Sequence, residues 1–329
     1  MTLSKVPRRA LVLALAALAA WTTGATATAQ DIRFDETIDV ERVVVDARVV
    51  DGRGRPLLGL SPGDFRVRVD GRDVALETAQ WITAPGYPRD PAQPAEADPG
   101  RLLVLLFQKD LDPSRAPGLL RMVDRVGELV RRGSAADRVA VVSFDSSLHL
   151  WADFTSDRAR IDAALRAVLL GGEAALESRD VPSLGAHLDL EAAERAASAE
   201  QALLVLARGL REMPGSKSLV LVGHGFDLPS VSVRRMLEDA RASVFALDVT
   251  NADSHTLETG LQQVAEDTGG FYARTHLFAG EAIARLENAL AGHYVLTFPR
   301  PVLPVGEHSV AISLVGKKGT VLARRTYRG

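Results

Sequence analysis

From Leu102 onward, short uninterrupted apolar runs alternate with longer stretches of helical periodicity. This pattern constrains the fold most, because a strand that is apolar on both faces must be covered on both faces. The expected strands lie at 102–107, 139–144, 219–222, 244–249, 271–273 and 294–298. The expected helices lie at 114–132, 156–170, 189–213, 229–241, 255–268 and 279–291. The pattern predicts an α/β fold, a doubly wound and mostly parallel sheet with helices on both faces.

Residues 38–82 follow a different pattern, in which apolar and polar residues alternate. The runs at 43–50 and 65–69 have a period of two, which is typical of strands with one buried face. The pair Asp70-Gly71 then predicts a hairpin turn. We expect a small sandwich-like β-module in which one face of the sheet meets solvent.

Two further segments complete the predicted organisation of the chain. Five prolines fall between Ala84 and Gly100 and exclude regular structure there, which marks a linker. Alternating runs at 310–314 and 321–325, separated by a turn at 316–319, predict a C-terminal β-hairpin. The expected parts are a signal peptide at 1–29, the N-terminal β-module at 30–83, the linker at 84–100, the α/β domain at 101–299 and a C-terminal β-extension at 300–329.

The first residues have the pattern of an export signal. Lys5, Arg8 and Arg9 precede the apolar run 10–21, and Ala27-Thr28-Ala29 supplies a small-x-small cleavage site. The alternative is a single membrane anchor, for which the run is short. The sequence thus predicts an exported protein, periplasmic or extracellular, that has no membrane span after cleavage.

Charge and composition exclude several classes of function. Without the signal, the chain carries about six more acidic than basic residues, so a nucleic acid is not expected as a partner. The absence of cysteine excludes disulfides, thiolate metal sites and a cysteine nucleophile. The sequence also lacks the Gly-x-Ser-x-Gly, His-Glu-x-x-His and phosphate-loop motifs of common enzymes.

Polar residues follow two of the predicted strands. Gln108, Asp110 and Asp112 come after the run 102–107, and His224 follows the run 219–222 between two glycines. Ligands of such sheets bind outside the carboxyl ends of the strands. These four residues are therefore candidate ligands of a cation, for which Mn²⁺ or Zn²⁺ would suit the imidazole better than Mg²⁺. Alternatively, Asp110 and Asp112 face solvent or begin the following helix.

The chain resembles the VWFA-related proteins of the acidobacterial type. The most specific element is the motif Gly52-x-Gly54-x-Pro56-x-x-Gly59-Leu60-x-x-x-Asp64-Phe65. The middle of the chain resembles a von Willebrand factor A domain, in which 138–145 matches the second strand. This resemblance implies binding of a protein partner through a divalent cation, held by Asp-x-Ser-x-Ser, by a threonine and by an aspartate after the fourth strand.

The sequence departs from that adhesion motif at each of its positions. Gln108 stands at the leading carboxylate, Asp110 and Asp112 stand at the two hydroxyls, and His224 replaces the aspartate. The middle loop at 171–178 has no threonine. The polar cluster is interpreted as a degenerate metal site, without a cofactor, reused as a helix start and contact surface.

The predicted function is therefore a non-catalytic protein-interaction module acting at the bacterial envelope or outside the cell. We expect the contact surface on the loops at 108–115, 144–148 and 223–230, at the carboxyl ends of the strands. The alternative is a metal-dependent hydrolase or other enzyme centred on His224 with Asp110 and Asp112. The partner and the oligomeric state do not follow from the sequence.

Overall fold

The computed structural model describes residues 41–84, 100–109, 112, 114–172, 174, 182–252 and 255–329. All of them belong to one compact unit, Val40–Gly329. The predicted signal peptide, most of the predicted linker and Asp110 lie outside the described residues.

A six-stranded sheet has the order β10-β9-β8-β5-β6-β7. Its strands are β5 (Leu102–Gln108), β6 (Arg138–Phe144), β7 (Leu148–Thr155), β8 (Lys217–Gly223), β9 (Ala242–Asp248) and β10 (Phe271–Arg274). Every pairing is parallel except that of β6 with β7. The predicted, mostly parallel sheet is confirmed.

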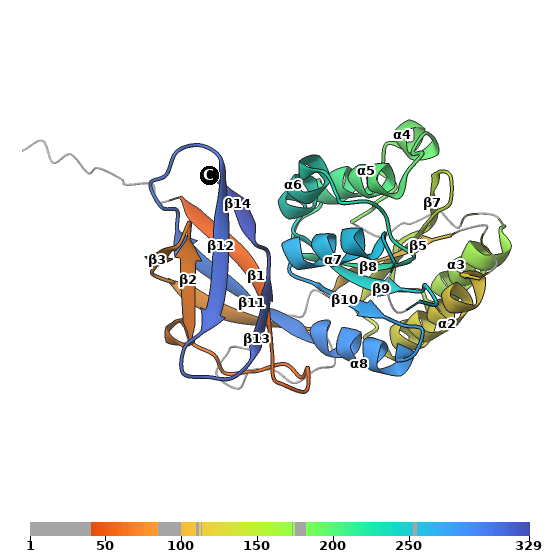
Figure 1. The fold of residues 1–329 in the computed structure, drawn as a ribbon. Coiled ribbons are helices and arrows are strands. Elements are labelled where there is room, and N and C mark those ends of the chain that lie inside the picture. Colours follow the sequence, from red (N-terminus) through yellow and green to blue (C-terminus); the bar gives the residue numbers. More distant parts are fainter. Residues whose placement is uncertain are drawn as a thin grey trace, which may run out of the picture. The chain divides into compact units, whose positions relative to one another are not determined.

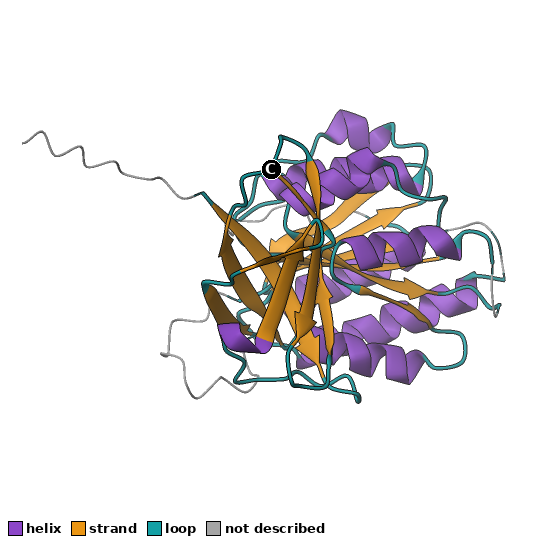
Figure 2. Cartoon of the chain, turned by 60° about the vertical axis from the view of Figure 1, so that its left-hand side comes forward, coloured by secondary structure: helices purple, strands orange, loops and turns teal. Residues whose placement is uncertain are grey.

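Helices cover both faces of this sheet, as Figures 1 and 2 show. They are α2 (Ala116–Arg132), α3 (Arg158–Leu170), α4 (Leu190–Glu194), α5 (Ala199–Arg211), α6 (Val231–Asp239), α7 (Glu258–Asp267) and α8 (Ala279–Ala289). Buried side chains of α5, α6 and α7 pack on one face, and those of α2, α3 and α8 on the other. Within the described ranges, no helix has the length and apolar character of a membrane span.

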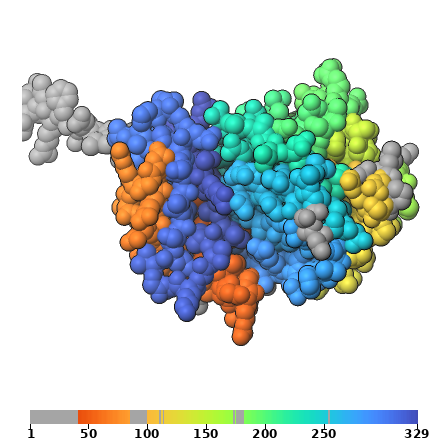
Figure 3. Space-filling view, viewed as in Figure 1, coloured from red at the N-terminus to blue at the C-terminus, as the bar shows by residue number. Residues whose placement is uncertain are grey.

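The remaining strands form two four-stranded sheets. One has the order β13-β1-β11-β4 and the other β14-β12-β2-β3. The strands are β1 (Arg42–Val50), β2 (Phe65–Val69), β3 (Arg72–Val74), β4 (Thr78–Thr83), β11 (Gly292–Pro299), β12 (Glu307–Leu314), β13 (Thr320–Ala323) and β14 (Thr326–Arg328), and a 3-10 turn, Pro62–Asp64, precedes β2. N-terminal strands thus pair with C-terminal ones, and the orange and blue surfaces adjoin in Figure 3.

The hairpin predicted at Asp70-Gly71 is present. Both residues have positive φ, 47° and 77°, and they join β2 to β3, where Val69 pairs with Arg72. Positive φ at both central positions gives a turn whose twist matches the twist of the strands. This local signal was sufficient because it needs no distant partner.

Two predicted strand assignments differ from the structure. The run 294–298, expected in the parallel sheet, lies in β11, which pairs antiparallel with β1 and β4. The expected C-terminal hairpin does not form, because β12 pairs with β2 and β14 whereas β13 pairs with β1. In both cases the strand finds a partner more than 200 residues away rather than its neighbour in sequence.

One strand was missing from the prediction, and one predicted helix is divided in two. The antiparallel edge strand β7 was not expected, although Leu148, Leu150, Ala152 and Phe154 alternate in its sequence. The helix predicted at 189–213 is two helices, α4 and α5. The break occurs where Ser198 accepts a hydrogen bond from the Gln201 backbone N–H and starts a new helix.

We expected one face of the β-module to meet solvent. In the structure, the face of β1 that carries Arg48 is covered instead. Val43, Val45, Ala47 and Val49 point into the sandwich core. On the other face, Arg48 donates to the side chains of Ser218 and Ser243 at the amino ends of β8 and β9. The six-stranded sheet therefore covers this face, and Arg48 is only 4% exposed.

Candidate functional site

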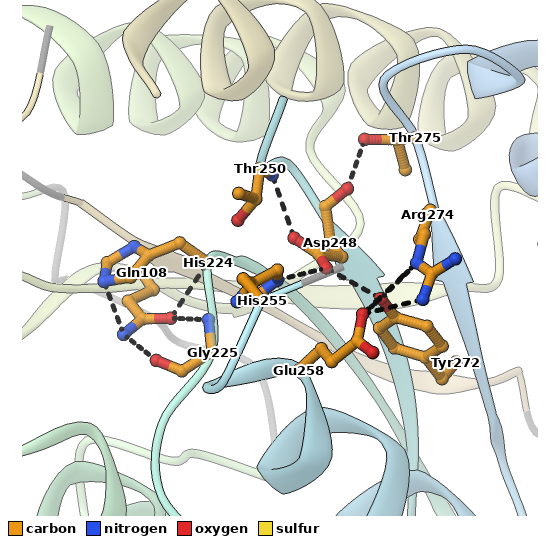
Figure 4. A network of polar contacts seen from close by, with 10 residues as sticks. All are labelled: Gln108, His224, Gly225, Asp248, Thr250, His255, Glu258, Tyr272, Arg274 and Thr275. Carbon is orange, nitrogen blue, oxygen red and sulfur yellow. Dashed lines mark hydrogen bonds and ion pairs between the residues drawn. The ribbon is translucent and has the colours of Figure 1, made fainter. Parts of the chain in front are cut away.

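Gln108 joins the ends of β5 and β8 at the carboxyl edge of the six-stranded sheet (Figure 4). Its Oε1 accepts hydrogen bonds from the backbone N–H groups of His224, at 3.1 Å, and Gly225, at 3.0 Å. Its Nε2 donates to the Gly225 carbonyl oxygen at 2.8 Å and lies 3.2 Å from His224 Nε2. These contacts, which we call the Gln108 clasp, hold the end of β5 against the backbone at 224–225.

The glycines beside the clasp permit its close geometry. A Cβ at position 223 would lie 2.4 Å from Gln108 Oε1, and one at 225 would lie 2.3 Å from the Leu257 carbonyl oxygen. Gly225 also has a φ of +100°, which L-residues rarely adopt. The Gly-His-Gly sequence at the end of β8 is thus explained by backbone packing around Gln108.

The clasp does not favour a cation at the adhesion position. Cations of this kind need oxygen atoms with lone pairs directed at the ion, whereas Gln108 Oε1 already accepts two backbone N–H groups. Asp112 Oδ1 accepts from the Ser114 N–H at 2.9 Å, and this bond, before any other cause, lowers the pKa of Asp112. The cation site predicted at Gln108, Asp110, Asp112 and His224 stays a prediction. The contacts of its three described residues offer it little support.

Asp112 lies ahead of the helix rather than at its cap. Helix α2 begins at Ala116 after Arg115, whose backbone N–H donates to the Asp112 carbonyl oxygen at 3.1 Å. Asp112 therefore closes the turn that leads into α2.

An ion pair joins the residues that follow β5 and β6: Lys109 Nζ lies 3.2 Å from Asp145 Oδ2. Partial burial raises the pKa of Asp145, but the Ser146 N–H and Lys109 outweigh it, so the net shift is downward.

His224 borders a cavity of about 220 Å³. Its described lining is Gln108, Lys109, Arg115, Ala116, Leu119, Leu120, Val168, Leu169, His224 and Val249. This set holds two cations and no carboxylate. A metal-dependent hydrolase needs an imidazole and carboxylates in one pocket, and the described lining does not bring them together.

A second polar network lies at the same edge, at the end of β9 (Figure 4). The carboxylate of Asp248, 1% exposed, accepts from the Thr250 N–H at 2.9 Å, from His255 Nε2 at 2.7 Å and from the Tyr272 hydroxyl at 2.7 Å. The Asp248 carbonyl oxygen accepts two more bonds from Thr275. Asp248 therefore fixes the loop after β9 and the end of β10 with one side chain and one carbonyl group.

Glu258 and Arg274 complete the network on the solvent side. Arg274 Nη2 donates to Glu258 Oε2 at 2.8 Å, and the Tyr272 hydroxyl lies 3.3 Å from that oxygen. Burial raises the pKa of Tyr272, and the hydrogen bond to Asp248 raises it further. Tyr272 is accordingly a hydrogen-bond donor at neutral pH.

Asp248, His255 and Glu258 are the described residues best placed to hold a metal, since their donor atoms all lie within 4.8 Å of one another. One imidazole and two carboxylates would suit Zn²⁺ or Mn²⁺. Each donor already has a partner, however: His255 donates to Asp248, and Arg274 pairs with Glu258. An ion would have to displace both contacts.

The sequence prediction did not include the Asp248 network. Part of its signal was present, because Asp248 interrupts the predicted apolar run 244–249 near its end, and His255 comes seven residues later. Tyr272 belongs to a different strand, and only the parallel pairing of β10 with β9 places it beside Asp248.

Comparison with known proteins gives structural matches only. No protein-family model matches the chain, and no curated protein matches it in sequence. The solved structure of BatB from Bacteroides thetaiotaomicron is 15% identical and has a TM-score of 0.39, over 57% of this chain and 97% of that one. A von Willebrand factor type A structure from Catenulispora acidiphila is 9% identical, with a TM-score of 0.42, over 88% and 72%. Manganese-loaded TRAP of Plasmodium vivax is 11% identical, with a TM-score of 0.37, over 68% and 94%.

The fold assignment comes from the chain's own topology. Five parallel strands and the antiparallel edge strand β7 form one sheet, and three helices or more pack on each face. The connection reverses direction between the adjacent strands β5 and β8, the point at which sheets of this class bind ligands. The α/β part of this chain has a von Willebrand factor A-like fold.

Proposed function

We propose that this chain is an exported, non-catalytic protein-interaction module that binds its partner at the carboxyl edge of the six-stranded sheet. The observation that carries this proposal is the position of exposed apolar side chains. Among the residues that the structure describes, six of the ten exposed large apolar side chains lie on loops or helix ends at this edge. They are Leu120, Leu170, Leu228, Val231, Leu277 and Phe278.

Exposed apolar groups gathered at one edge, with polar groups between them, are typical of protein contact surfaces. Leu228 is 61% exposed and Phe278 is 59% exposed. At the same edge, the Gln108 clasp fixes the backbone at 224–225, and the Asp248 network fixes Thr250, His255 and Thr275. A surface that is rigid before binding loses less conformational entropy on association, which supports a binding role for the edge.

Site-specific photocrosslinking in the native host tests this surface. A photoreactive phenylalanine analogue at Leu228 or Phe278 is expected to give one discrete protein adduct. The matched control places it at Val305, which is 85% exposed in the loop before β12. Adducts at Val305 with none at the edge would overturn the proposed contact surface. The export part of the proposal rests separately on the predicted signal peptide.

We also propose that the module needs no resident cation. Mg²⁺, Mn²⁺ and EDTA are each expected to leave the melting temperature of the purified chain within about 1 °C, since an ion stabilises only by binding the folded state. The measurement is differential scanning fluorimetry with metal analysis. The contrary result is that Zn²⁺ or Mn²⁺ raises the melting temperature of the natural chain but does not raise that of His255→Ala. It would establish a cation site at Asp248, His255 and Glu258 instead.

A further inference from the structure

A further cavity among the described residues lies at the opposite end of the parallel strands. It measures about 390 Å³ and opens where β5, β6 and β8 begin, beside β4 and β11. Apolar residues form much of its wall, among them Ile82, Leu102, Leu290 and Val295. A cavity of this size accommodates a small organic molecule.

The charges around this cavity are of one sign. Four arginines line it, Arg48, Arg101, Arg138 and Arg241, and the described lining includes no carboxylate. Two of these arginines form ion pairs with carboxylates: Arg101 pairs with Asp137, and Arg241 pairs with Asp46. The hydrogen-bond acceptors of Arg48, by contrast, are neutral.

Arg48 is the most deeply buried of these cations. Its Nε donates to the Ala289 carbonyl oxygen at 3.0 Å, its Nη1 to Ser243 Oγ at 2.9 Å and its Nη2 to Ser218 Oγ at 3.2 Å. All three acceptors are neutral. A guanidinium has five N–H groups, so two remain for an acceptor that the described residues do not provide.

A buried cation whose hydrogen-bond acceptors are all neutral is costly, and the environment of Arg48 reflects that cost. Burial lowers the pKa of Arg48 to about 10, although Asp46 opposes the shift. Lys217, whose ammonium donates to the carbonyl oxygens of Met213 and Ala240, has its pKa lowered by burial to about 8. Lys217 is not part of the cavity lining, so Arg48 is the buried cation that lines the cavity with neutral hydrogen-bond acceptors.

We propose that this cavity binds a small organic anion, a carboxylate or phosphate attached to an apolar body, with Arg48 as its main counter-charge. The apolar wall takes the body of the ligand, and the guanidinium takes the oxyanion through charge-assisted hydrogen bonds. This site is independent of the proposed contact surface, which lies at the other end of the sheet.

Titration calorimetry with phenyl phosphate, benzoate and inorganic phosphate tests the proposal. Phenyl phosphate is expected to bind more tightly than inorganic phosphate, because only the former uses the apolar wall. Arg48→Met should weaken its binding at least about tenfold, the loss expected for a charge-assisted contact. The control Arg53→Met, an exposed arginine in the turn after β1, should leave binding unchanged.

A second variant decides the question if Arg48→Met does not fold. Pro214 is exposed and lines the cavity, so Pro214→Trp should obstruct the opening and abolish binding while the core stays intact. The proposal is overturned if none of the three anions binds at about 10 mM, a very weak affinity. Binding that neither substitution changes would overturn it too.

The chain itself carries carboxylates at Asp90, Glu96 and Asp98, between the lining residues Ala84 and Gly100. A variant with Asp90→Asn, Glu96→Gln and Asp98→Asn distinguishes a free anion from these side chains. Equal binding of phenyl phosphate by the variant and the natural chain supports the free anion. Binding by the variant alone would identify the chain's own carboxylates as the occupant and overturn the proposal.

Discussion

Replacing Asp248 by alanine is expected to lower the free energy of unfolding by about 3–5 kcal/mol, one of the largest effects of any substitution at the candidate site. The buried carboxylate accepts hydrogen bonds from the Thr250 N–H, His255 Nε2 and the Tyr272 hydroxyl. Alanine leaves three donors without that acceptor, and each buried donor so orphaned costs about 1–3 kcal/mol. Urea denaturation at neutral pH measures the loss.

Two controls separate the network from a general effect of removing charge. Tyr272→Phe removes a single donor and should cost only about 1–2 kcal/mol. Asp73→Ala removes a carboxylate whose side chain is 65% exposed and pairs with Arg68 at the surface, so its effect should stay within about 0.5 kcal/mol. If Asp248→Ala costs no more than Asp73→Ala, the network is not the support of this edge.

The α/β fold could be predicted because its signals are local. A run such as 102–107 is apolar on both faces, and this alone requires cover on both sides of the strand. The true β11 follows another rule: Tyr294, Leu296 and Phe298 are buried and alternate with less buried neighbours. Val295 made the run look continuous, so the prediction placed it in the parallel sheet.

The sandwich could not be assembled from sequence for a different reason. Its pairings join β1 to β11 and β2 to β12, strands separated by most of the chain. Alternation shows that a strand has a buried face, but it does not show which strand lies beside it. The burial of Arg48 depends on the same long-range arrangement, and an arginine on an alternating strand is ordinarily expected to face solvent.

At the candidate site, the sequence indicated where Gln108 and His224 lie, but not which contacts they make. Gln108 and His224 do meet at the carboxyl edge, as the position of both after buried strands indicated. Their contact is a clasp of hydrogen bonds, in which the amide both donates to and accepts from the 224–225 backbone, and the cation predicted for them stays a prediction. Residue type alone does not distinguish an amide that binds metal from one that binds backbone.

Changing Gln108 to glutamate is expected to destabilise the chain at pH 7 by about 3–5 kcal/mol, although the two side chains have the same shape. One carboxylate oxygen can still accept from the His224 and Gly225 N–H groups. The other would lie where Nε2 now donates to the Gly225 carbonyl oxygen at 2.8 Å, so two acceptors would face each other. Gln108 is 6% exposed, and little solvent is available to screen that repulsion.

The variant should recover stability in acid, which a simple loss of packing would not do. Burial and the facing carbonyl favour the neutral acid, so the pKa of the new carboxyl rises above the unfolded value of about 4.3. Between those two pKa values the folded state binds more protons than the unfolded state, and stability falls as pH rises. Below both, the carboxylic acid can donate to Gly225 as the amide does.

Urea denaturation of Gln108→Glu, of Gln80→Glu and of the natural chain from about pH 4 to pH 8 isolates this effect. Gln80 is exposed on β4, so Gln80→Glu should follow the natural chain at every pH. A Gln108→Glu variant as stable as the natural chain at pH 7 would mean that His224, 3.2 Å from the substituted nitrogen, takes up a proton and pairs with the new carboxylate. The edge would then tolerate a carboxylate at position 108, and the hydrogen bonds of the amide would no longer explain why glutamine stands there.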